Sequence, residues 1–202
     1  MPVARISRRF FERYTPQVAR ELLGCRLVRV LDGERLSGVI VETEAYRGAE
    51  DPASHAYRGM TKRNDVMFGP AGRAYVYFTM GMHYCLNITT EPEGTAAAVL
   101  VRALEPREGI ETMRRGRGTA DVRRLASGPG NLTKALMIDR SLNGEDLVTS
   151  RALFVQRGEA IREVGVSTRV GVSSGANLRW RFYAKDSPFV SKGRPSVSAQ
   201  NP

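Results

Sequence analysis

The chain has 202 residues, of which 42% are hydrophobic and 26% are charged, a composition typical of a globular protein with a substantial core. Its formal net charge of +10 comes mainly from arginine. Arginine donates bidentate hydrogen bonds to phosphates and base edges, so the charge favours nucleic acid as the partner, the lesser alternative being a bias toward arginine codons with no partner implied. No apolar run approaches the roughly 20 residues of a membrane span, and the first residues lack the apolar region of a secretory signal. We therefore expect a cytoplasmic protein without membrane contact, associated with the nucleoid if it is bacterial.

The first elements follow from local turn and cap signals. A Thr-Pro start and a glycine stop predict a helix over residues 16–23. The Asp-Gly turn at residues 32–33 predicts a hairpin between strands over residues 26–31 and 35–46.

The second of these strands carries an unusual face. Alternation places Glu42, Glu44 and Tyr46 on one side of it. Carboxylates are depleted in strands, so the pattern indicates either a solvated face or a general base beside a stacking aromatic ring. The following residues, 47–72, are rich in glycine, proline, aspartate and asparagine, which predicts a long loop of the kind that usually carries function.

A second hairpin is predicted from strands over residues 74–79 and 83–88. Tyr75 and Tyr77 share one face of its first strand. Met80 falls at the exposed tip, where a large apolar side chain gains nothing from folding. We therefore expect Met80 to contact something other than the core.

The apolar run over residues 96–104 is interrupted only by Arg102. Such a run is typical of a strand buried on both faces. A buried arginine needs an anionic partner, and a carboxylate of an active site would serve.

The rest of the chain predicts one α+β domain of mostly antiparallel strands, over residues 10–190, between a flexible basic N-terminus (1–9) and a disordered tail (191–202). Candidate phosphate contacts are Arg63 in the long loop and Arg114, Arg115 and Arg117 in a basic stretch. The alternative is that these arginines form a solvated surface. The remaining predicted elements are a helix over 106–115, a flexible basic loop over 114–124, a helix from Asn131 to about 137, and strands over 153–156, 168–172 and 181–184.

Metal chemistry is not expected. Cys25 and Cys85 stand apart, with no Cys-x-x-Cys spacing and no cluster of histidines. The spacing gives no support for a disulfide between them either.

A set of short motifs, in order over roughly residues 10–190, resembles the alkyladenine (3-methyladenine, or methylpurine) DNA glycosylase family. Each motif is weak alone, whereas the ordered set is highly specific. The matching segments are VETEAY (41–46), DPASH (51–55), MFGP (67–70), YVY (75–77), GMHYCLN (81–87), LVRALEP (100–106), SGPGNL (127–132) and RVGV (169–172).

This resemblance implies a compact mixed α/β domain around a curved antiparallel sheet, acting as a monomer on double-stranded DNA that contains damaged purines, without metal or cofactor. It implies that the base is flipped out of the duplex and its N-glycosidic bond hydrolysed. Alkylated or deaminated purines are the implied substrates: 3-methyladenine, 7-methylguanine, hypoxanthine and ethenoadenine. Because none of the four lysines, Lys62, Lys134, Lys185 and Lys192, lies in a matched catalytic motif, we expect simple hydrolysis that leaves an abasic site.

The resemblance also implies roles for individual positions. Glu44 matches the general base, Arg102 a residue that helps to hold the attacking water, and Val170 the position whose backbone carbonyl contacts that water. The walls that sandwich the flipped base match Tyr46, His55 and Tyr77, and Asn87 matches a position that screens bases.

Three points stay open at this level. Met80 stands where vertebrate members carry a wedging tyrosine; methionine is an accepted wedge between base steps, and packing onto a neighbouring loop is the alternative. Glu42 could replace Glu44 as the base on geometry alone. The residues assign no acid for neutral bases.

Two other functions are rivals to a glycosylase. One is a catalytically silent protein that senses lesions or bends DNA, and the other is an RNA-binding domain.

Overall fold

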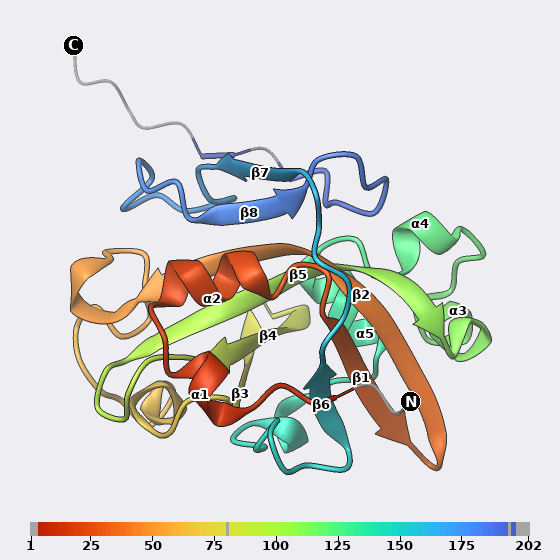
Figure 1. Ribbon diagram of the computed structural model, residues 1–202, viewed down its shortest axis with the longest axis horizontal. Coiled ribbons are helices and arrows are strands. Elements are labelled where there is room, and N and C mark those ends of the chain that lie inside the picture. The colour runs from red at the N-terminus through yellow and green to blue at the C-terminus, as the bar shows by residue number, and fades with distance from the viewer. Residues whose placement is uncertain (1–3, 80, 194, 197–202) are drawn as a thin grey trace.

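The fold is described here from a computed structural model, for residues 4–79, 81–193 and 195–196. Within them, eight strands form one curled antiparallel sheet, in the order β3-β4-β5-β2-β1-β6, with β8 pairing with both β2 and β7 (Figure 1). The α+β class and single compact domain are thereby confirmed. The strands are β1 (Arg26–Leu31), β2 (Glu34–Arg47), β3 (Ala74–Thr79), β4 (His83–Thr89), β5 (Ala97–Glu108), β6 (Leu153–Gln156), β7 (Val164–Ser167) and β8 (Arg181–Ala184).

Helices cover the sheet and enclose the core. Helix α2 packs on β2 and β5, while α5 packs on β4 and β5 and is itself contacted by α3. No helix in the described ranges is long and apolar enough to cross a bilayer. The helices are α1 (Arg8–Phe11), α2 (Thr15–Glu21), α3 (Ile110–Arg117), α4 (Val122–Leu125) and α5 (Pro129–Ala135), and 3-10 turns occur at Gly48–Glu50, Asp65–Phe68 and Arg140–Leu142.

Strand β2 is the strand on which the site depends. It pairs with β1 over its first half, with β5 along most of its length, and with β8 at Glu42, Thr43 and Glu44. Its pairing with β5 shifts register around residues 40–43, and such irregularities bend a strand and increase its twist. The bend brings β8 onto the end of β2 that carries both carboxylates.

Several predicted elements are wrong at their ends. Strand β5 continues through Pro106 to Glu108, so the helix expected over 106–115 is α3, which begins only at Ile110. Pro106 is tolerated because it pairs with Gly38 at a register shift of β2, where a missing N–H disturbs the ladder least. The basic stretch expected to be a flexible loop instead forms the end of α3 and the short helix α4.

Two further expectations in the C-terminal half are corrected. Asn131 does not cap a helix, because α5 already begins at Pro129; its side-chain amide donates to the Ser127 carbonyl at 2.7 Å. The strand expected over 168–172 is absent, and β7 lies just before it. Gly171 has a φ of 71°, a left-handed conformation that breaks a strand.

At both chain ends the described residues contact the rest of the domain. The N-terminus contributes the buried Ile6 and helix α1. Beyond residue 190, the Ser191 N–H donates to Glu42 and the Ser196 N–H to the Arg169 carbonyl, at 2.8 and 2.7 Å. Residues 1–3, 80, 194 and 197–202, and with them the prediction for Met80, lie outside the described residues.

Candidate active site

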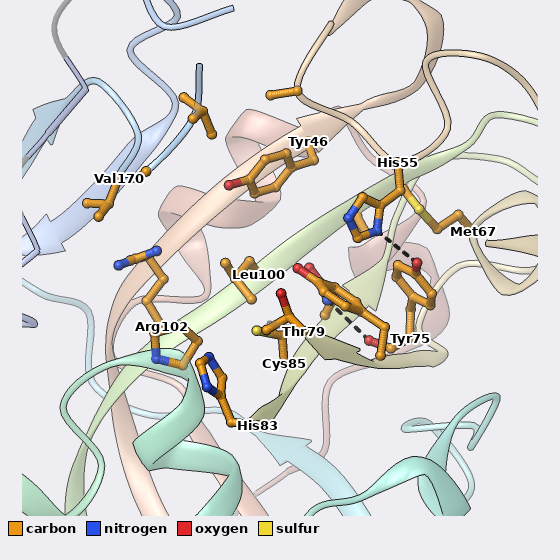
Figure 2. Close-up of a pocket in the computed structure, with 17 residues that line it drawn as sticks. Tyr46, His55, Met67, Tyr75, Thr79, His83, Cys85, Leu100, Arg102 and Val170 are labelled. Carbon is orange, nitrogen blue, oxygen red and sulfur yellow. Dashed lines mark hydrogen bonds between the residues drawn. The ribbon is translucent and has the colours of Figure 1, made fainter. Parts of the chain in front are cut away.

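A cavity of about 250 Å³ opens beside the β3–β4 hairpin, between β2, β5 and the segment after β7 (Figure 2). It draws residues from segments far apart in the chain, as the ordered motifs predict. The lining residues are Tyr46, Ala53, His55, Met67, Tyr75, Tyr77, Thr79, His83, Cys85, Asn87, Ala98, Leu100, Arg102, Pro129, Val170, Gly171 and Val172.

Glu44 lies directly behind this lining, fully buried. Its carboxylate accepts hydrogen bonds from the Tyr46 hydroxyl at 2.9 Å, from Arg102 Nη1 at 3.2 Å, and from the Val170 N–H at 2.7 Å. A buried charge is costly unless it is paired and hydrogen-bonded, and these three donors meet that need. All three donors line the cavity, so Glu44 is hydrogen-bonded to three residues of the cavity wall.

Glu42 is also fully buried, so a solvated strand face is the wrong interpretation of this pattern. Its Oε1 accepts from Arg102 Nε at 2.9 Å and from Arg181 Nε at 2.7 Å. Burial acts to raise the pKa of Glu42, but the charges of Arg102 and Arg181 outweigh it, and the pKa lies below its usual value. The predicted anionic partner of Arg102 is thus confirmed: it is bonded to both carboxylates.

Aromatic rings form the wall opposite Arg102. The rings of Tyr75 and Tyr77 lie 5.3 Å apart, and His55 meets Tyr77 edge-on at 4.5 Å. His55 Nδ1 is hydrogen-bonded to the Tyr75 hydroxyl at 2.9 Å, as Figure 2 shows. Burial and the Arg63 charge lower the pKa of His55, so its ring is neutral at pH 7; burial raises the pKa of Tyr75 to about 12. The wall therefore carries no net charge.

Tyr46 stands on the other side of the cavity. Burial and the Glu44 carboxylate raise its pKa well above the usual value, so its hydroxyl remains a donor to Glu44. The guanidinium of Arg169 lies 4.6 Å from the Tyr46 ring centroid, and Arg169 is itself fully buried and paired with Asp51. This pair holds the ring from outside the cavity, since neither charged residue lines it.

The floor of the cavity is closely packed. Asn87 is buried and donates from its side-chain amide to the Tyr75 carbonyl at 3.2 Å. Cys85 and Leu100 lie beside it, and burial raises the pKa of the Cys85 thiol. Both cysteines are free and buried.

The four candidate phosphate contacts separate into two groups. Arg63 is exposed beside the cavity, 5.4 Å from the Tyr77 ring centroid. The other three lie on α3, and none of them lines the cavity. Of these, Arg114 pairs with Glu111, and Arg117 donates to two carbonyls of α4.

Sequence reasoning missed Asp51, Arg169 and Arg181 as parts of the site. Asp51 and Arg169 do fall inside the matched motifs, and that position was the available signal. Arg181 gave no such signal. Among the residues described, no group of three or more histidines, cysteines or acids could hold a metal ion.

A buried carboxylate behind an aromatic cavity, on a strongly basic α+β protein, fits the class of enzymes that remove bases from DNA. The sequence model of one such family, described as methylpurine-DNA glycosylase (MPG), matches residues 9–188. The chain belongs to the methylpurine-DNA glycosylase family. It is therefore a hydrolase acting on N-glycosyl bonds, a DNA repair enzyme for alkylated bases, rather than a silent DNA-binding protein or an RNA-binding domain.

Several relatives carry the name "Putative 3-methyladenine DNA glycosylase". One from Carboxydothermus hydrogenoformans is 52% identical, over 93% of this chain and 98% of its own. One from Methanocella arvoryzae is 50% identical, over 96% and 98%. A third, from Chlorobium phaeovibrioides, is 48% identical over 95% and 99%.

Proposed function

We propose that this enzyme flips alkylated or deaminated purines out of duplex DNA and hydrolyses their N-glycosidic bond with a water that Glu44 activates. The proposed substrates are the 3-methyladenine, 7-methylguanine, hypoxanthine and ethenoadenine class, and the product is an abasic site. The observation that carries the proposal is the Glu44 carboxylate, held by three cavity-lining donors directly behind an aromatic cavity. We propose that the enzyme acts as a monomer.

Base flipping needs a pocket that repays the lost stacking. Extruding a nucleotide costs a few kcal/mol, and stacking on an aromatic ring returns about 1–3 kcal/mol per base. Tyr46 and Tyr77 line the cavity, with His55 beside them. The two tyrosine rings are the proposed walls of a sandwich around the base, and Asn87 on the floor is proposed to screen it.

Hydrolysis then needs a base and a stabiliser of positive charge. The sugar develops oxocarbenium character as the bond breaks. A carboxylate in a site without bulk water can take a proton from the attacking water and stabilise that charge. Arg102 and the Val170 carbonyl are proposed to hold the water. The Val170 N–H bond to Glu44 supports this, because it fixes that backbone next to the carboxylate.

A cationic base such as 3-methyladenine leaves without help, whereas a neutral base needs a proton. Among the described residues that line the cavity there is no lysine to form a covalent intermediate with the sugar. This supports a monofunctional glycosylase, without lyase activity.

We also propose Met80 as the wedge that fills the gap in the duplex. The residues around it support this, since Phe78 and Met82 on the same hairpin are 45% and 66% exposed. Apolar side chains of this kind insert between base steps in other DNA-bending proteins.

The proposal is tested with duplexes that each hold one 7-methylguanine, hypoxanthine or ethenoadenine, incubated with the enzyme and split into two portions. Alkali cleaves abasic sites, so we expect a strand break at the lesion in the alkali-treated portion alone, and well above that of an enzyme-free sample, because alkali also opens 7-methylguanine by itself. A break without alkali would indicate lyase activity. Absence of a break for every lesion, from folded protein, would contradict the proposed substrates.

A further inference from the structure

Glu42 is a buried carboxylate that the proposed reaction does not use. Neither Glu42 nor Glu44, two residues apart on β2, itself lines the cavity, but all three donors to Glu44 do, whereas of the donors to Glu42 only Arg102 does. Four donors surround it: Arg102 Nε at 2.9 Å, Arg181 Nε at 2.7 Å, and the Ser191 N–H and hydroxyl at 2.8 and 2.9 Å. A carboxylate so fully bonded is poorly placed to take a proton from water.

The geometry of Arg102 indicates what Glu42 does instead. Arg102 reaches Glu42 through Nε at 2.9 Å and Glu44 through Nη1 at 3.2 Å. Charge-assisted hydrogen bonds are usually about 2.7–2.9 Å long, so the firmer of the two bonds goes to Glu42. The Arg102 guanidinium is therefore shared by the two carboxylates, and Glu42 holds it more firmly than Glu44 does.

Glu42 is itself anchored from two other elements. Arg181 comes from β8, where it pairs in register with Glu44, and it also donates to the Ser167 hydroxyl. Ser191 comes from the segment after β8, beyond the residues 9–188 that the family model matches. Arg102 Nη2 also lies 3.4 Å from the Ser191 hydroxyl. The cluster thus holds two carboxylates and two guanidiniums, and its formal charge is zero.

We infer that Glu42 is a positioning residue, which holds the Arg102 guanidinium and offsets part of its charge beside Glu44. This rests on the proposed function of Glu44. Without the Glu42 charge, the full charge of Arg102 would act on Glu44, which would be harder to protonate and a weaker base. Without Arg181 the cluster would carry a net negative charge, and Glu44 would be easier to protonate.

Two titratable groups beside Glu44, a phenol and a thiol, do not change charge in the working pH range. Burial raises the pKa values of Tyr46 and Cys85, so both are neutral at pH 7. Arg169, above the Tyr46 ring, is paired with Asp51. The charged and titratable groups that face Glu44 are Glu42 and Tyr46 on β2, Arg102 on β5, Arg181 on β8, Cys85 on β4, and Arg169 in the segment before Val170.

The test is the pH dependence of single-turnover excision, from about pH 4 to 8, with depurination measured without enzyme subtracted. 7-Methylguanine is the substrate because it is cationic and needs no general acid. The fall in rate at low pH (the acid limb) then contains the titrations of the base and of His55, whose pKa is lowered by burial and which lines the same cavity. Because His55 is unchanged in every variant, a difference between limbs reports the base. For Glu42→Gln we expect the acid limb to move down by about one pH unit and the plateau rate to fall about tenfold. For Arg181→Gln we expect the limb to move up. The second variant also tests the inference if the first does not fold.

Glu91→Gln is the matched control. Glu91 is a buried carboxylate that pairs with Arg47 and does not line the cavity, so its variant should lose stability without moving the limb. Unmoved limbs in both site variants, or shifts of the same sign in both, would overturn the inference. Glu44→Gln separates the two ideas: if it is inactive while the Glu42 and Arg181 variants keep the wild-type profile, only the inference fails. If Glu44→Gln turns over normally, the proposed function of Glu44 fails.

Discussion

Tyr77 is the residue whose contribution to base binding is easiest to isolate. Its ring lines the cavity beside Tyr75 and His55, and its pKa is raised by burial and by Cys85. Its hydroxyl therefore stays neutral, and the ring offers a π-face without charge. Stacking, rather than ion pairing, is what such a wall can contribute.

Replacing Tyr77 by leucine should weaken binding to lesion-containing DNA by roughly tenfold. Loss of base stacking costs about 1–3 kcal/mol, and 1.4 kcal/mol is about one factor of ten. Equilibrium binding to a duplex with one ethenoadenine, followed by anisotropy, measures the change. Tyr77→Phe is the control, because it keeps the ring, and it should bind within about threefold of the wild type. Equal losses in both variants would argue that the hydroxyl matters rather than the ring.

At the scale of elements, the pair of Asp51 and Arg169 joins two loops on either side of Tyr46. Arg169 Nη2 donates to Asp51 Oδ1 at 2.7 Å, and its Nη1 donates to the Ala45 carbonyl at 3.0 Å. Arg169 directly precedes Val170, and Asp51 lies four residues before His55. The pair thus fixes segments that bring residues to the cavity from opposite walls.

Asp51→Asn should therefore destabilise the whole domain. Breaking one half of a buried ion pair costs about 3–5 kcal/mol, and for a domain of this size each kcal/mol lowers Tm by about 2–4 °C. We expect Tm to fall by about 6–20 °C in a thermal melt. The matched control is Asp146→Asn, which breaks the partly exposed pair with Arg8 and should cost no more than about 1 kcal/mol. Similar melting temperatures for the two variants would contradict this role.

Elements set by local signals could be predicted from the sequence. The strand ranges 26–31, 74–79, 153–156 and 181–184 agree with β1, β3, β6 and β8 residue for residue. Alternation and turn residues are local, so they are visible in the sequence. The prediction of a strand over 168–172 was wrong. The alternating valines there are typical of a strand, but Gly171 has a left-handed backbone conformation that turns the chain.

The site was predictable only in part, for a related reason. Alternation correctly put Glu42 and Glu44 on one face, and the apolar run correctly required a partner for Arg102. Which partners meet depends on contacts between distant segments: Arg181 and Ser191 lie 139 and 149 residues from Glu42. No periodicity in the sequence carries that information.

At the scale of the molecule, the basic side chains behind the net charge of +10 are not equally free to contact DNA. Arg63 is exposed next to the cavity and makes one long bond, to the Phe78 carbonyl at 3.5 Å. Arg117 is half-buried and held by the Leu125 carbonyl at 2.9 Å and the Arg124 carbonyl at 3.4 Å. Each phosphate contact releases counterions, so it contributes to the salt dependence of binding. The four candidate arginines are therefore not expected to contribute equally.

Arg63→Ala should lower the slope of log Kd against log salt concentration by about one on an undamaged duplex. Arg117→Ala should leave that slope close to the wild-type value, because its guanidinium is half-buried and firmly bonded to the Leu125 carbonyl at 2.9 Å. Binding titrations over a range of salt concentrations measure both slopes. An equal fall for Arg117→Ala would mean that α3 reaches the DNA backbone.

The most direct test of the account is single-turnover excision by Glu44→Gln, with its affinity for the same lesion duplex measured in parallel. Glutamine keeps the size of the side chain but cannot accept the proton of water, so we predict a rate at least about 10²-fold lower with affinity little changed. Excision by Glu44→Gln at the wild-type rate would contradict the claim that this buried carboxylate activates the attacking water.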